Sequence, residues 1–116
     1  MEEINALLEK HKKFKYAQIR SIEQLSDDTR TLTIVVLDDD GEEDLHTIKI
    51  EFKGIKNSRI LQNDVLGYLD MSFGISIIKE NNLYGFALGS GTAMLHVHNA
   101  PLYIISSDIK IEENKQ

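Results

Sequence analysis

The feature that most constrains this chain is a segment in which polar and apolar residues alternate strictly. In HTIKIEFK, residues 46–53, Ile48, Ile50 and Phe52 share one face, and the residues between them are polar. Successive side chains of a strand point to opposite faces of a sheet, so the segment predicts a strand with one buried and one wet face. Such strands are typical of antiparallel sheets, which often leave one face in water.

Two further strands are expected before this one. TRTLTIVVL, residues 29–37, is dense in β-branched residues and predicts a central strand. It is separated from residues 46–53 by a short acidic segment, so the two predict an antiparallel hairpin. Residues 15–25 predict a first strand, which ends at the turn-forming pair Asp27 and Asp28.

The N-terminal residues follow a different period. Apolar or weakly polar positions recur at helical spacing in residues 2–13, which predicts a short amphipathic helix; they are Ile4, Leu7, Leu8 and His11. Gly54 is expected to end the strand that precedes it. The following residues, 54–72, fit either a short helix or an irregular covering segment.

Four apolar-rich stretches separated by turn residues fill the rest of the chain, and we interpret them as strands; they are FGISIIKEN, LYGFALG, TAMLHVH and PLYIISSDIKIEE. In the last stretch, alternate positions predict one shared face, formed by Tyr103, Ile105, Ser107, Ile109 and Ile111.

Six or seven short strands at about ten-residue spacing, with one N-terminal helix, indicate an α+β fold that is mostly β. We expect a single domain over residues 1–116, with strands from about 15 to 112 in an antiparallel curved sheet, open barrel or sandwich.

The acidic segment between the two hairpin strands is the leading candidate for a partner-binding site. It places six carboxylates in seven positions, namely Asp38, Asp39, Asp40, Glu42, Glu43 and Asp44. A calcium loop with Gly41 at position six would need an aspartate and a glutamate where Val36 and Thr47 stand. Acid–base catalysis would need burial to separate the pKa values, and a hairpin loop is wet. We therefore expect a solvated turn or a negative surface that docks on a basic partner.

Two histidines raise the possibility of a metal. On a strand, His96 and His98 would share a face, and His46 could supply a third ligand. No carboxylate or third histidine has diagnostic spacing, so we expect ordinary polar-face residues and no metal or cofactor. Ser90 lacks the flanking glycines of a nucleophile elbow, and the sequence predicts no enzyme.

The charge and composition narrow the partners. The formal net charge of −6 disfavours binding to nucleic acid. The chain has no cysteine, and its first 15 residues form neither a secretory signal nor a membrane span, so we expect a cytoplasmic protein that does not bind a membrane. An uncovered sheet edge would also permit a homodimer.

Residues 14–61 open with FKYAQIRSI, continue through the predicted two-strand hairpin and close with IKIEFKGI. In this pattern they resemble small cytoplasmic immunity proteins of bacterial polymorphic-toxin and contact-dependent inhibition systems. It implies a non-enzymatic binder that neutralises a cognate toxin, and the acidic loop could then enter the basic groove of a toxin nuclease. A small-ligand or metal-binding β-barrel protein and a homo-oligomeric structural subunit remain alternatives.

Overall fold

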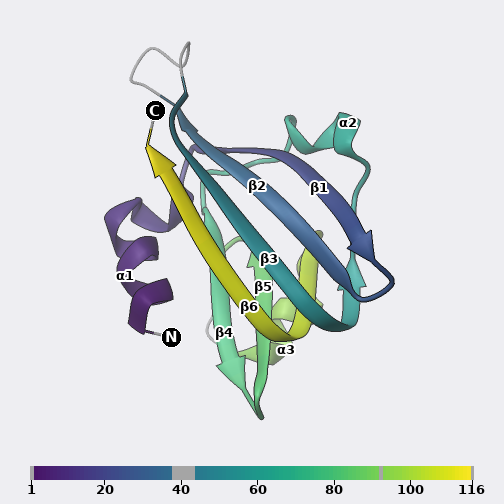
Figure 1. Cartoon of the computed structure of the whole chain (residues 1–116). Coiled ribbons are helices and arrows are strands. Elements are labelled where there is room, and N and C mark those ends of the chain that lie inside the picture. The colour runs from purple at the N-terminus through teal and green to yellow at the C-terminus, as the bar shows by residue number, and fades with distance from the viewer. Residues whose placement is uncertain (1, 38–43, 92, 116) are drawn as a thin grey trace.

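The computed structural model describes residues 2–37, 44–91 and 93–115, which form one antiparallel sheet with short helices (Figure 1). The strands are β1 (Gln18–Ser26), β2 (Thr29–Leu37), β3 (Asp44–Arg59), β4 (Ile75–Glu80), β5 (Leu83–Leu88) and β6 (Tyr103–Lys115). The helices are α1 (Glu2–Lys10), α2 (Asn63–Leu66) and α3 (Met94–His98), and a 3₁₀ turn, η1 (Lys12–Phe14), follows α1.

The six strands lie in the order β1-β2-β3-β6-β5-β4, so β1 and β4 are the two edges of the described sheet. The described strands do not close into a barrel. The predicted fold class, an antiparallel and mostly β structure with an N-terminal helix, is confirmed.

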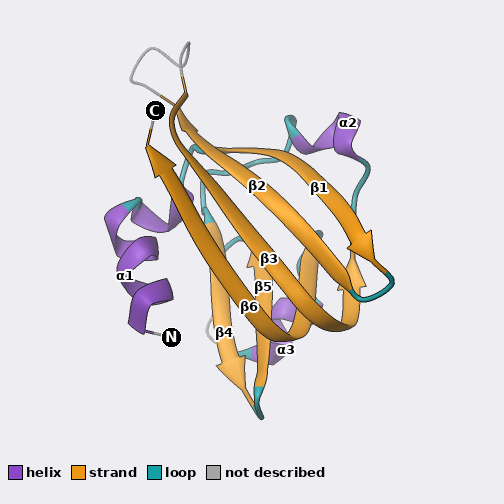
Figure 2. Cartoon of the chain, viewed as in Figure 1, coloured by secondary structure: helices purple, strands orange, loops and turns teal. Residues whose placement is uncertain are grey.

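The sheet curves over itself because its two long central strands bend (Figure 2). β3 pairs with β6 along almost its whole length, with an irregularity between Ile55 and Asn57. Gly54 has a φ of +66°, and an added Cβ would lie 2.1 Å from the Ser107 Oγ on β6. Glycine therefore allows the close approach of the two strands at the bend.

The hydrophobic core fills the concave side of this bend. Phe52 of β3 and Phe86 of β5 are fully buried, and their ring centroids are 5.5 Å apart. The contact joins the two halves of the folded-over sheet, and burying each such ring contributes about 2–3 kcal/mol. From α1, Leu8 is buried in the same cluster, and Ile4 and Leu7 pack against it.

The structure corrects the predicted ends of β3 and of the N-terminal helix, and the predicted face of β6. Gly54 does not end β3, which continues to Arg59, because the glycine provides a bend instead of a stop. The helix predicted over residues 2–13 ends at Lys10. The face predicted for β6 is also split: Ile105 belongs to a separate small cluster, whereas Ile109 packs against the main core.

The stretch TAMLHVH was predicted to be a strand, and this prediction is wrong. Met94–His98 form the short helix α3, which covers the outer face of β5. A Cβ on Gly85 would lie 2.7 Å from the Met94 Sδ and 3.1 Å from a Val97 methyl group. Packing over this glycine fixes the helical turn, and tertiary contact overrides the β propensity of the segment. None of the helices in the described part of the chain has the length and apolar character needed to cross a membrane.

Candidate functional site

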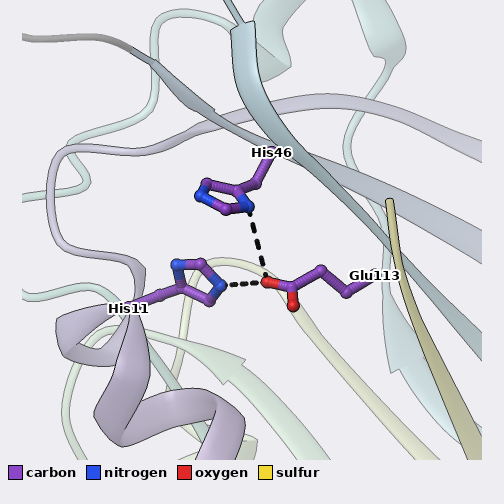
Figure 3. Close-up of side chains that lie close together, drawn as sticks. All are labelled: His11, His46 and Glu113. Atoms are coloured by element: carbon purple, nitrogen blue, oxygen red, sulfur yellow. Dashed lines mark hydrogen bonds and ion pairs between the residues drawn. The ribbon is translucent and has the colours of Figure 1, made fainter. Parts of the chain in front are cut away.

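Three polar residues, His11, His46 and Glu113, lie together at one end of the sheet. Each follows or precedes a series of apolar residues on the same face of its strand or helix. His46 precedes Ile48 in the buried row of β3, and the β3–β6 register pairs Ile48 with Glu113. His46 and Glu113 are therefore diagonal neighbours on the core-facing side. His11 lies just after α1, at the end of that helix's apolar stripe, and completes the cluster (Figure 3).

Both histidines point to the same oxygen of the carboxylate (Figure 3). The His11 Nε2 is hydrogen-bonded to the Glu113 Oε2, and the His46 Nδ1 lies 3.7 Å from that oxygen. The imidazole ring centroids are 5.0 Å apart. One donor atom from each of the three residues lies within 4.8 Å of the other two.

The cluster is partly enclosed, and its neighbours fix its orientation. The His11 side chain is only 5% exposed, against 20% for His46 and 22% for Glu113. The Phe14 ring stacks on His11 with centroids 5.2 Å apart. The Lys10 Nζ donates to the other carboxylate oxygen, the Glu113 Oε1, over 2.8 Å.

Glu113 is held in its charged form. Its hydrogen bond with the Lys10 ammonium, and next its hydrogen bond with His11, lower the pKa of the Glu113 carboxyl below its ordinary value of 4.5. Charged hydrogen-bond donors favour the carboxylate over the neutral acid. At neutral pH the cluster therefore contains a carboxylate with fixed geometry.

An unusual backbone turn places His11 and Phe14. Lys12, Lys13 and Phe14 all have left-handed φ values of 54° to 59°. The turn returns Phe14 to the core, where it is 1% exposed and lies against the His11 ring. Gly74 makes room for it, because a Cβ there would lie 2.1 Å from the Lys13 carbonyl oxygen. Left-handed backbone at non-glycine residues is costly, and it persists only where the surrounding packing compensates.

The cluster can act in two ways. As an ion-pair network it fastens the end of α1 to β6, through Lys10, His11 and Glu113. As a donor set, two imidazole nitrogens and one carboxylate oxygen are groups that a divalent metal ion could share.

The acidic run mostly lies outside the described residues. This holds for Asp38, Asp39, Asp40, Glu42 and Glu43. Asp44 begins β3, where its backbone pairs with Leu37 at the end of β2. The predicted hairpin is therefore confirmed, and the acidic run connects its two strands. Val36 pairs with His46, so the cluster lies at the same end of the hairpin.

The structure does not place His96 and His98 as the metal-binding pair that the sequence left as a weaker possibility. Both lie on α3 instead of a strand, and residues two apart on a helix do not face each other. The His98 ring packs edge-on to Tyr103 at 5.6 Å. His46, considered as their third ligand, lies instead with His11 and Glu113.

Sequence reasoning placed His11 in the helical stripe but did not join it to Glu113. A signal was present, because each of the three residues ends an apolar row where another apolar residue would be expected. The β3–β6 register, and the packing of α1 against the sheet, cannot be read from spacing alone.

The fold and the site define an open antiparallel β-sheet protein with a His–His–Glu cluster at one end. Comparisons with protein-family models, curated proteins and solved structures found no match. The interpretation of the site therefore depends on the geometry of this chain.

Proposed function

We propose that this protein is a non-enzymatic binding module that acts in the cytoplasm on a basic protein partner, in the manner of a toxin immunity protein. The observation that carries the proposal is the pairing of Leu37 with Asp44, which makes residues 38–43 of the acidic run the connection of a β-hairpin. Hairpin connections lie at the surface, where charged side chains can reach a partner.

Charge supports the same function. The acidic run contains six of the chain's 19 acidic residues within seven positions, on a protein of net charge −6. A concentrated negative surface accelerates encounter with a positive one and makes the affinity dependent on salt. The substrate groove of a toxin nuclease is a positive surface of this kind, and an acidic loop can occupy it in place of a phosphate backbone.

The test begins with capture of partners from an extract of the source cells at low ionic strength, followed by salt elution. The captured protein is then measured against the triple variant Asp38→Asn, Asp39→Asn, Asp40→Asn. We expect association at least ~10-fold slower and a flatter salt dependence, because steering by the loop is lost while folding is unchanged.

A matched control removes three carboxylates elsewhere. Glu9, Glu23 and Glu112 are exposed on α1, β1 and β6, and their replacement by Gln makes the same change in net charge. The proposal requires this control to bind with nearly wild-type kinetics. Equal effects from the two triple variants would show that only net charge matters, and no effect from either would exclude the loop as the contact.

A further inference from the structure

We propose that His11, His46 and Glu113 form a binding site for one divalent transition-metal ion of the zinc class. The donor atoms are the His11 Nε2, the His46 Nδ1 and the Glu113 Oε2, which come from the end of α1, from β3 and from β6. This inference concerns a different group of residues from the acidic loop and does not depend on the proposed partner.

One donor distance is already close to what zinc requires. Zinc bonds to nitrogen and oxygen are about 2.0–2.2 Å, so two ligand atoms of a tetrahedral site lie about 3.4 Å apart. The His46 Nδ1 and the Glu113 Oε2 are 3.7 Å apart. His11, which is hydrogen-bonded to the same oxygen, needs only to withdraw slightly for an ion to enter among the three donors.

One of the three donor atoms lacks a hydrogen-bond partner. The His46 Nδ1 is buried and has no hydrogen-bond partner among the described residues. Its 3.7 Å separation from the carboxylate oxygen is too long for a hydrogen bond. Buried polar atoms are rarely left without a partner, and a metal ion between the nitrogen and the carboxylate would provide one.

The surroundings hold the ligands as a metal site needs. Phe14 stacks on the His11 ring, and Lys10 binds the Glu113 Oε1, which leaves the Oε2 for the ion. Such contacts to ligand residues orient them and tune metal affinity. The Lys10 charge also opposes a bound cation, so we expect moderate affinity.

The donor types select the class of metal. Imidazole nitrogen suits zinc, copper, nickel and iron, whereas calcium and magnesium prefer sets of oxygen ligands. Two histidines and one carboxylate leave a tetrahedral ion with one open position. Glu113 also lines a cleft of about 800 Å³ between α1 and β6, so its side chain borders solvent-accessible space.

The experiment is a calorimetric titration of the chelator-treated full chain with zinc, with the histidine ring signals followed by NMR. We expect one equivalent to bind, with perturbation of His11 and His46 and a rise in Tm with zinc concentration. His46→Gln and Glu113→Gln should each weaken binding at least ~10-fold, because each removes a ligand.

The double variant His96→Gln, His98→Gln is the matched control, since it removes two imidazoles from a distant helix. It should bind zinc as the wild type does. Loss of binding in this control, unchanged binding in His46→Gln, or no saturable binding in the wild type would overturn the proposal.

A second measurement covers the case in which a ligand variant fails to fold. Cobalt added to the wild-type chain should give the intense visible bands of a tetrahedral site with nitrogen and oxygen ligands. A spectrum identical to that of the free ion would overturn the proposal without any substitution.

Discussion

Glu113 forms the ion-pair contacts that link the end of the N-terminal helix to β6. It contacts Lys10 and His11 at the end of α1 and lies beside His46 of β3. Replacement by Gln should lower the free energy of unfolding by about 0.5–1.5 kcal/mol at pH 6, because a partly buried charged hydrogen-bond acceptor is removed. Denaturant unfolding in the absence of metal measures the loss.

The pH dependence of this loss has a definite sign. The pKa of Glu113 is lower in the folded chain than its ordinary value of 4.5, so the unfolded chain binds the proton more readily. The contribution of Glu113 to stability is present above that value and disappears as pH falls through the folded pKa. The difference in stability between wild type and Glu113→Gln should therefore narrow as pH falls below 4.5. The exposed neighbour Glu112, replaced by Gln, is the control, and an equal effect there would contradict the role given to Glu113.

At the scale of elements, the bend in β3 depends on Gly54. An alanine there would combine the strain of a φ of +66° with a Cβ 2.1 Å from the Ser107 Oγ, which lies 3.3 Å from the Lys53 carbonyl oxygen and donates a hydrogen bond to it. We expect Gly54→Ala to cost about 2–3 kcal/mol of stability in chemical denaturation.

Substitution of Gly89 tests the effect of backbone strain without a steric clash. Its φ is +97°, but an added Cβ would meet nothing within 4 Å, so Gly89→Ala should cost only the backbone strain, about 1 kcal/mol. Ser107→Ala in the Gly54→Ala background should recover part of the difference, because the clashing oxygen is removed. Equal costs for the two glycine variants would show that the approach to Ser107 does not constrain β3.

The elements that were predicted correctly are those whose local pattern agrees with their burial. The first half of β3 alternates in sequence as it does in the sheet, and β2 is dense in β-branched residues, so their hairpin was predictable. α3 was not, because Val97 is buried only by packing over Gly85, which is remote in sequence. The His–His–Glu cluster escaped prediction for a similar reason. It needs the β3–β6 register to bring His46 beside Glu113, and the packing of α1 against the sheet to bring His11 to a residue 102 positions away.

At the scale of the whole molecule, the exposed strand edges are guarded. β1 carries two register irregularities, between Ile19 and Ser21 and between Gln24 and Ser26, and such bulges discourage pairing with another strand. At the other edge, η1 packs against the chain at Gly74, directly before β4 begins.

β6 pairs with β5 only from Tyr103 to Ser106. Beyond Ser106 its second edge has no strand partner among the described residues, and α1 lies alongside it (Figure 1).

This arrangement predicts that α1 keeps the chain monomeric. Leu7 packs against the core and lines the same cleft as Ile109 and Ile111 of β6. Leu7→Asp places a charge at this position, so α1 should detach from the sheet. The edge of β6 would then be free to pair with another strand. Light scattering should give 13.2 kDa for the wild type and a larger mass, rising with concentration, for the variant. Leu95→Asp is the control, because Leu95 is already 70% exposed on α3 and its replacement should leave a monomer.

NMR signals of α1 report whether the helix has detached. A detached helix with an unchanged mass of 13.2 kDa would mean that the β6 edge is protected without α1, by the twist of the sheet itself.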